Sequence, residues 1–180
     1  MANKLSKVQI QNVLGDLSKN GIISNNFNQQ FDHAIIKQLA NCNIIKKNKN
    51  DKSCHQTHIH ITGDEVPFFP YNVSVEYTKT GKNKIYQTID VLLDGENLDY
   101  LKDEDNHSDL NTEVTCYVRE GKQKSQIQLS KLDSDGVEFL NFRDQLFEDD
   151  YIIMLKNNDL DRYIFLGIKS EENLPVGVFY

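Results

Sequence analysis

Tryptophan is absent from this chain, and cysteine, methionine and proline are scarce, with 3, 2 and 3 residues among 180. An odd number of cysteines at irregular spacing does not predict a disulfide framework and favours a reducing compartment. The N-terminus, MANKLSKVQIQNVLG, has no continuous apolar core of the kind found in signal peptides. No run approaches the roughly 18 apolar residues of a membrane span. We therefore expect a cytoplasmic protein without a membrane partner.

Motifs for catalysis and for cofactor binding are also missing. The sequence contains neither GxxxxGK[ST] nor GxGxxG, the patterns through which glycine-rich loops hold phosphates. It contains no serine or cysteine nucleophile elbow. We therefore expect no catalytic residue, no cofactor and no resident metal in this segment, although an enzyme is not excluded.

Two metal hypotheses involve histidine. Zinc-ligand residue types gather in one part of the chain but match no zinc-finger spacing: Cys42, Cys54, His55, His58 and His60. His58 and His60 followed by Glu65 are similar to the first metal motif of the cupins, but the flanking glycines and a second histidine motif are absent. A small metal-dependent enzyme therefore remains an alternative.

A third metal hypothesis involves carboxylates. Glu120-Gly121-Lys122, with Asp90 and Asp94 upstream, has the D…ExK order of magnesium-dependent nucleases. Gly121 is more simply explained as the apex of a hairpin, where the glutamate and lysine side chains would diverge into solvent. The nuclease hypothesis is therefore also kept as an alternative.

Charge is distributed unevenly along the chain, whose formal net charge is −7. The stretch from Asp90 to Glu113 contains nine acidic residues and one basic residue, Lys102. The rest of the chain is close to neutral, with its lysines concentrated in a few predicted loops. This balance does not fit an indiscriminate nucleic-acid binder, for which a pI above about 9 is expected.

Two helices are predicted near the N-terminus. The first is predicted over residues 5–19 from the spacing of Leu5, Val8, Leu14 and Leu17, with Asn20-Gly21 as a stop. The second is predicted over residues 27–40, where apolar residues recur at steps of three and four: Phe27, Phe31, Ala34, Ile35 and Leu39. Together the two would form a helix-turn-helix or a packed helical hairpin. A polar basic loop over 43–55 follows.

Strands are predicted over most of the remaining chain. The segment HQTHIHITG alternates, so His58 and His60 should face one side and Ile59 and Ile61 the other. Residues 71–93 predict a hairpin that turns at Thr80-Gly81-Lys82-Asn83, because β-branched and aromatic residues flank a glycine-containing turn. The acidic stretch 94–112 has too few apolar residues for a strand and predicts a loop.

Residues 113–168 carry the strongest fold signal. A hairpin is predicted from Glu113 to Leu129 with its tip at Glu120-Gly121-Lys122, and a short helix over 137–147. Two apolar strands, 151–155 and 163–168, are predicted to lie centrally and to be joined by a tight turn. The fold class is therefore α+β, with five to seven largely antiparallel strands.

The order of elements over residues 126–168, QIQLSKLDSDGVEFLNFRDQLFEDDYIIMLKNNDLDRYIFLGI, resembles the C-terminal half of the plant-type "B-three" DNA-binding pseudobarrel. Asp149-Asp150 stands where that family has a Gly-Asp turn. The same pseudobarrel is the effector domain of some restriction endonucleases, including the N-terminal domain of LlaJI-type, McrB-like restriction proteins. The resemblance implies a largely antiparallel β pseudobarrel with N-terminal helices and a short helix between the last hairpins. It also implies that residues 1–180 are one DNA-binding domain at the N-terminal part of a longer protein, with a fused or associated ATPase or nuclease subunit.

In that family two arms grip the major groove of double-stranded DNA. The resemblance implies that residues 79–84 or 46–52 form one arm here and residues 119–124 the other. Lysines would contact phosphates, while arginine, asparagine and glutamine would reach base edges. We therefore expect site-specific binding of double-stranded DNA, as the recognition module of a prokaryotic restriction system, through these residues: Lys46, Lys47, Lys49, Lys52, Asn72, Lys79, Lys82, Asn83, Lys84, Arg119, Lys122, Gln123 and Lys124.

One competing interpretation assigns the working surface to the acidic stretch. Lysines at hairpin tips are ordinary solubility residues that also protect sheet edges from aggregation. In that case the chain would be a protein-interaction or assembly module, and residues 90–113 would bind the partner.

Overall fold

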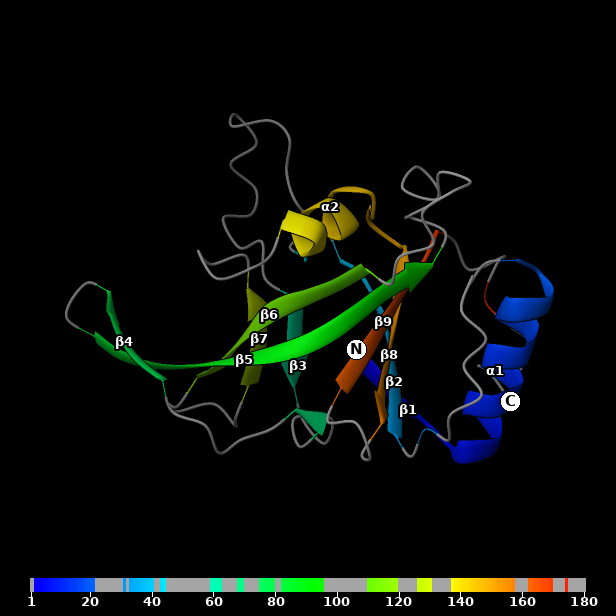
Figure 1. The fold of residues 1–180 in the computed structure, drawn as a ribbon, viewed down its shortest axis with the longest axis horizontal. Coiled ribbons are helices and arrows are strands. Elements are labelled where there is room, and N and C mark those ends of the chain that lie inside the picture. The colour runs from blue at the N-terminus through cyan, green and yellow to red at the C-terminus, as the bar shows by residue number, and fades with distance from the viewer. Residues whose placement is uncertain are drawn as a thin grey trace.

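The computed structural model describes residues 2–21, 31, 33–40, 43–44, 59–62, 68–69, 75–79, 82–95, 110–119, 126–130, 137–157, 162–169 and 174. Over these residues the chain is α+β, with one mixed sheet and two helices (Figure 1). The helices are α1 (Lys7–Lys19) and α2 (Val137–Asp144). The strands are β1 (Ala2–Leu5), β2 (His33–Gln38), β3 (Ile59–Thr62), β4 (Val75–Lys79), β5 (Lys82–Gly95), β6 (Leu110–Arg119), β7 (Gln126–Ser130), β8 (Tyr151–Asn157) and β9 (Arg162–Ile168).

The sheet has the strand order β1-β2-β8-β9-β5-β6-β7-β3, with β4 attached to β5. Among the described strands, β5 and β9 form the parallel pair, and the other pairs are antiparallel. The largely antiparallel sheet and the central position of β8 and β9 are thus confirmed. Nine described strands exceed the expected five to seven, partly because β1, with the sequence ANKL, is too short to show a period in the sequence.

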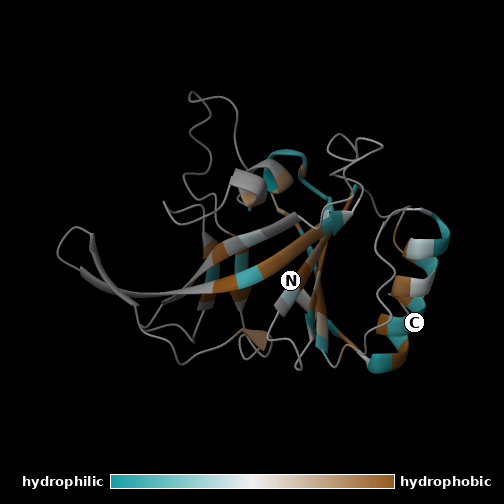
Figure 2. Ribbon diagram, in the orientation of Figure 1, coloured by the Kyte–Doolittle hydropathy of each residue, from teal (hydrophilic) through white to brown (hydrophobic). Residues whose placement is uncertain are grey.

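The central strands separate two apolar clusters, because successive side chains of a strand point to opposite faces. The α2-side core includes Ile152 and Met154 of β8, Phe165 of β9, and Phe139 and Phe142 of α2. The α1-side core includes Ile153 and Leu155 of β8, Leu166 of β9, and Ile10, Val13, Leu14 and Leu17 of α1. Figure 2 shows hydrophobic colour along these strands and on α1.

The first predicted helix is confirmed as α1, with a later start. Ser6 caps it: its Oγ accepts a hydrogen bond from the Gln9 N–H (3.3 Å), and Gln9 Oε1 accepts one from the Ser6 N–H (2.9 Å). Leu5 belongs to β1 instead. Val8, which was expected on the apolar face, is 67% exposed, because the buried face is formed by Ile10, Val13, Leu14 and Leu17.

The second predicted helix is wrong where the structure describes it. Residues His33–Gln38 form β2, which pairs with β1 on one side and β8 on the other. Ile35 faces the α2-side core, whereas Ala34 and Ile36 face the α1-side core. A strand buried on both faces has a continuous apolar run, which periodicity alone does not distinguish from a helix. The helix-turn-helix hypothesis and the plural N-terminal helices fail for this reason.

The predicted hairpins are confirmed in their described parts. Lys79 pairs with Lys82, so Lys82 and Asn83, which were expected in the turn, belong to β5. The β6–β7 hairpin closes at Arg119 and Gln126, and the β8–β9 hairpin at Asn157 and Arg162. The short helix between the last hairpins is α2.

The acidic loop is shorter than predicted at both ends. Residues 94–95 end β5 and residues 110–112 begin β6, because Leu93 pairs with Leu110 in the sheet. Residues 96–109 lie outside the described part of the chain. Among the described residues, no helix is both long and apolar enough to cross a membrane.

The parallel β5–β9 contact ends in two facing glycines, Gly95 and Gly167. Gly95 has φ +122°, a conformation that side chains with a Cβ rarely adopt. A Cβ added at Gly95 would also lie 2.3 Å from the carbonyl oxygen of Gly167. Both the conformation and the close approach therefore require glycine at this position.

Gly95→Ala should lower the free energy of unfolding by on the order of 2 to 4 kcal/mol, because it adds both backbone strain and a clash with backbone. Gly15→Ala is the matched control, since a Cβ at Gly15 in α1 would meet no atom within 4 Å. It should stabilise by about 0.5 to 1 kcal/mol through helix propensity. Urea unfolding of both variants measures these effects, and equal stabilities would contradict the account.

Candidate nucleic-acid interface

The β4–β5 ribbon projects beyond the rest of the sheet (Figure 1). β5 pairs with β4 from Lys82 to Tyr86, whereas its ladder with β6 begins at Ile85 and Val118. Among the described strands, residues 82–84 are therefore paired with β4 alone. A two-stranded antiparallel ribbon of this kind can enter a groove that a wider sheet cannot.

Five of the predicted DNA-contacting residues lie in these strands. Lys79 and Lys82 form the closing pair of the ribbon, Asn83 lies opposite Thr78, and Lys84 lies opposite Tyr77. Arg119 pairs with Gln126 at the closing step of the next hairpin.

The register also relates these two hairpins to each other. Ile85 pairs with Val118, and Lys84 and Arg119 are each one residue beyond that pair. They therefore occupy neighbouring positions on adjacent strands. The structure thus places Lys84 of the first hairpin next to Arg119 of the second.

The remaining predicted contacts lie outside the described residues: Lys46, Lys47, Lys49, Lys52, Asn72, Lys122, Gln123 and Lys124. Two of these segments have described attachment points. Residues 120–125 connect Arg119 to Gln126, which are register partners in the β6–β7 hairpin. The basic loop instead returns to the sheet at Ile59, which pairs with Leu129, three residues along β7 from Gln126. Its attachment thus lies about 10 Å along the strand from the hairpin end.

Hydrogen bonds join the residue that follows β2 to the turn that precedes β8. The Leu39 N–H donates to the Asp150 carbonyl (2.8 Å), and the Asp149 N–H donates to the Leu39 carbonyl (2.9 Å). Asp149 has φ +71°, and Asp150 Oδ2 accepts from the Phe147 N–H at 2.7 Å. The turn that precedes β8 is thereby fixed against the end of β2.

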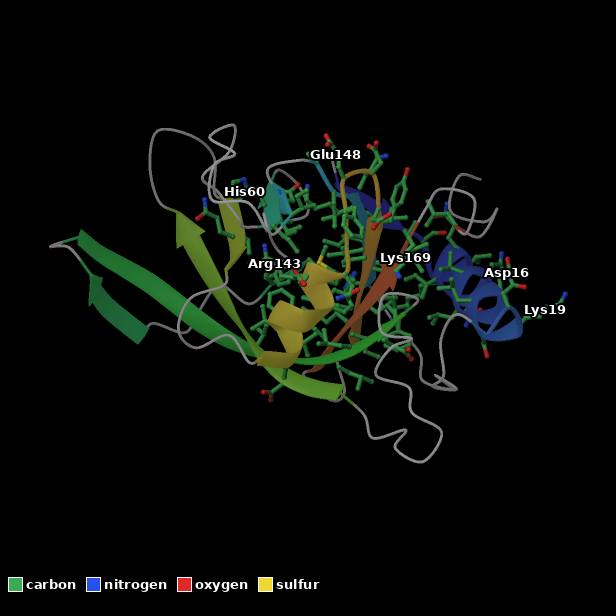
Figure 3. All side chains as sticks on the ribbon, turned by 90° about the horizontal axis from the view of Figure 1, so that it is seen from above. Asp16, Lys19, His60, Arg143, Glu148 and Lys169 are labelled. Atoms are coloured by element: carbon green, nitrogen blue, oxygen red, sulfur yellow. The ribbon has the colours of Figure 1, made fainter. Side chains whose placement is uncertain are left out.

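Arg143, at the C-terminal end of α2, contacts the segment that follows β2 (Figure 3). Its Nη2 donates to the carbonyl oxygen of Asn43 at 3.3 Å, and its side chain is only 2% exposed. The guanidinium carbon lies 5.4 Å from the ring centroid of Phe139. Arg143 was not singled out from the sequence, because no local pattern predicts a buried arginine.

The metal hypotheses find no support among the described residues. His60 lies in β3, partly buried, opposite Gln128, while Ile59 and Ile61 are buried in the α2-side core as predicted. Within the described ranges no three His, Cys, Asp or Glu side chains are grouped to hold a metal ion. The other zinc and cupin candidates lie outside those ranges: Cys42, Cys54, His55, His58 and Glu65.

The carboxylates of the nuclease hypothesis have different environments. Asp90 is exposed, whereas Asp94 is 2% exposed and its Oδ1 accepts a hydrogen bond from the Gly95 N–H at 2.7 Å. Glu120, Gly121 and Lys122 lie outside the described residues. The nuclease motif therefore has no described geometry.

The acidic stretch places like charges opposite each other in the sheet. Asp90 of β5 is the register partner of Glu113 of β6. The neighbouring pair Ile89 and Val114 is buried in the α2-side core. Because side chains alternate, the exposed Asp90 lies on the opposite face of the sheet.

No family model, no curated protein and no solved structure matches the chain. The comparisons therefore assign neither a family nor a relative.

Asp90→Lys should stabilise the fold by about 0.5 to 1 kcal/mol at low salt, because it replaces a like-charge cross-strand pair with an opposite-charge one. The gain should shrink as salt screens the pair. Asp90→Asn is the control and should give a smaller gain, since it only removes repulsion. Thermal unfolding at low and high salt measures both, and a gain that is independent of salt would contradict the charge explanation.

Proposed function

We propose that this chain is a site-specific double-stranded-DNA-binding domain, the recognition module of a cytoplasmic prokaryotic restriction system. The observation that carries the proposal is the common end of the β4–β5 and β6–β7 hairpins. Lys84 lies there next to Arg119 on the adjacent strand, and Lys82 and Lys79 form the closing pair of the ribbon two residues further out. This end supplies both phosphate-neutralising and base-reading groups.

The projecting ribbon suits duplex DNA. A two-stranded β-ribbon fits the B-DNA major groove, which is about 12 Å wide. Lysines near its closing pair would contact phosphates, and Arg119 and Asn83 would contact base edges. The acidic remainder of the chain would repel DNA from other surfaces, which favours a single binding face.

A pseudobarrel is the finer fold that we propose for this scaffold. β2 and β3 lie near opposite ends of the strand order, yet Ile35 of β2 and Ile61 of β3 belong to the same α2-side core. A flat sheet would not bring them together, so this shared core supports strong curvature. The placement of α2 between the β6–β7 and β8–β9 hairpins also agrees with the element order of the B-three resemblance.

Cleavage would come from outside this segment. We assign no catalysis, metal or cofactor to residues 1–180, which would form a single N-terminal recognition domain. A fused or associated ATPase or nuclease subunit would supply the motor and the chemistry.

A protein-interaction module is the second candidate, and one observation favours it. The Asp90–Glu113 register pair places like charges opposite each other, which opposes folding. A partner with basic groups would neutralise this pair on binding.

A binding titration against a randomised duplex pool at two salt concentrations, followed by sequencing of the retained DNA, tests the first candidate. We expect an enriched motif and an affinity that falls steeply with salt, because bound lysines release counterions from phosphates. Absence of retention at low salt would contradict DNA binding and favour a protein partner of residues 90–113.

Arg119→Ala should reduce the discrimination between the enriched duplex and a random duplex by about 1 to 3 kcal/mol, as for loss of a bidentate contact to guanine. Lys84→Ala should instead weaken both duplexes alike and lower the salt slope by about 1. Lys19→Ala is the charge-matched control, because Lys19 is exposed on α1 away from the ribbon (Figure 3). Equal losses on both duplexes for Arg119→Ala would show that Arg119 contacts only phosphate.

A further inference from the structure

The sheet has two faces at the hairpin end, and the buried residues of β5 identify them. Ile89, Val91 and Leu93 belong to the α2-side core, so the even-numbered residues of β5 belong to the opposite face, here called the outer face. The exposed Asp90 agrees with this assignment. The registers of β5 with β4 and β6 pair residues one to one, without a bulge, so the alternation continues to the N-terminal end of β5. Lys84 is therefore on the outer face.

Register partners place a compact set of basic and aromatic residues on this outer face. Directly opposite residues of an antiparallel pair share a face, and successive rows along a strand are about 7 Å apart. The set, here called the basic–aromatic strip, runs from the ribbon end inward as follows: Lys79 with Lys82, Tyr77 with Lys84, Arg119 beside Lys84, and Tyr86 with Tyr117.

The opposite face of the same strands has different chemistry. It takes Glu76 and Thr78 from β4, Asn83 and Ile85 from β5, and Val118 from β6. Lysines that only protect a sheet edge have no reason to share one face with the tyrosines. The separation therefore indicates a contact surface for a ligand that is negatively charged and carries planar rings.

Described residues bound the strip on two sides. Along β5, the exposed Asp90 lies four residues, about 13 Å, beyond Tyr86. Across the sheet, Gln128, the β7 partner of Tyr117, is only 8% exposed, so the strip is confined to β4, β5 and β6. Leu92 is the described residue of β5 that belongs to the α1-side core, and Figure 1 shows α1 far from the ribbon. Since α2 packs on the other face, neither described helix covers the strip.

We propose that the basic–aromatic strip binds an unpaired nucleic-acid strand, with bases stacked on its tyrosines and phosphates against its lysines and arginine. Antiparallel sheets that bind single strands stack bases on surface aromatic rings, because every base has a π-face. The bases of a duplex are already stacked on one another, so rings interleaved with cations favour an unpaired strand. This activity goes beyond the proposed duplex recognition and does not depend on it, although both use Lys84 and Arg119.

The test compares unpaired strands with a duplex. Anisotropy titrations at two salt concentrations use fluorescein-labelled oligo(dT) and oligo(U) of about 12 nucleotides, within the range that single-strand-binding folds cover. The randomised duplex pool is titrated in parallel. Tyr86→Thr and Tyr117→Thr each remove a ring but keep a residue of high strand propensity, whereas Tyr86→Phe and Tyr117→Phe keep the ring. Thr78→Ala, on the opposite face of the ribbon, is the control.

Each threonine variant should weaken binding of the unpaired strand about 10-fold, as one stacked base is lost, and should leave duplex binding within about 2-fold. The phenylalanine variants and Thr78→Ala should stay within about 2-fold for both ligands, because the rings remain. Affinity for the strand should fall with salt by a slope of about 0.7 per phosphate contact. Tighter binding of oligo(dT) would identify DNA as the preferred strand and tighter binding of oligo(U) RNA, and either result supports the proposal.

A tryptophan reporter tests stacking directly. The chain contains no tryptophan, so Tyr117→Trp introduces a single indole. Stacking of a base on this ring should quench its emission when oligo(dT) is added, whereas the duplex pool should leave the emission unchanged. This measurement removes no ring, so it applies even if the threonine variants fail to fold.

The outcomes separate this inference from the proposed function. If neither oligonucleotide binds, or if Tyr86→Thr and Tyr117→Thr weaken strand and duplex equally or weaken neither, the stacking role is overturned, while duplex recognition is judged by the pool titration. If the unpaired strand binds through the tyrosines and the duplex pool is not retained, the proposed function fails and this inference stands.

Discussion

Burial of β2, β8 and β9 on both faces is the constraint on which the rest of the structure depends. Their side chains alternate between the α2-side core and the α1-side core, so neither cluster can form without the same three strands. α1 has no other apolar surface to cover among the described elements, and α2 packs on the opposite face through Phe139 and Phe142. Both helices are therefore placed by the sheet, and Arg143 reaches Asn43 only because α2 lies on that face.

β5 connects this doubly buried part of the sheet to the candidate DNA-binding end. Its C-terminal half pairs in parallel with β9 and buries Ile89, Val91 and Leu93, whereas residues 82–84 at its N-terminus carry the ribbon. A single strand thus belongs to the core at one end and to the projecting hairpin at the other. The facing Gly95 and Gly167 permit the close parallel contact that fixes the direction of this strand.

Much of this fold was predicted from local sequence patterns. The features that depend on contacts between distant parts of the chain were not predicted. The β4–β5, β6–β7 and β8–β9 hairpins follow from turn residues between alternating strands, and α1 and α2 follow from apolar spacing. β2 was predicted as a helix because burial on both faces removes alternation, and only the partners β1 and β8 distinguish the two. The candidate contact residues were found by type, but the adjacency of Lys84 and Arg119 depends on register between β5 and β6. No local pattern predicted that Arg143 is buried, because its hydrogen bond goes to Asn43, 100 positions away in the chain.

The same strands also separate opposite charges along their length. The exposed Asp90 lies six residues along β5 from Lys84, which corresponds to about 20 Å at 3.3 Å per residue. This exceeds the Debye length of about 8 Å at physiological salt, so the Asp90 carboxylate does not neutralise the basic hairpin end. Under the proposed function, an acidic chain would bind duplex DNA through one end because β5 holds acidic and basic groups apart.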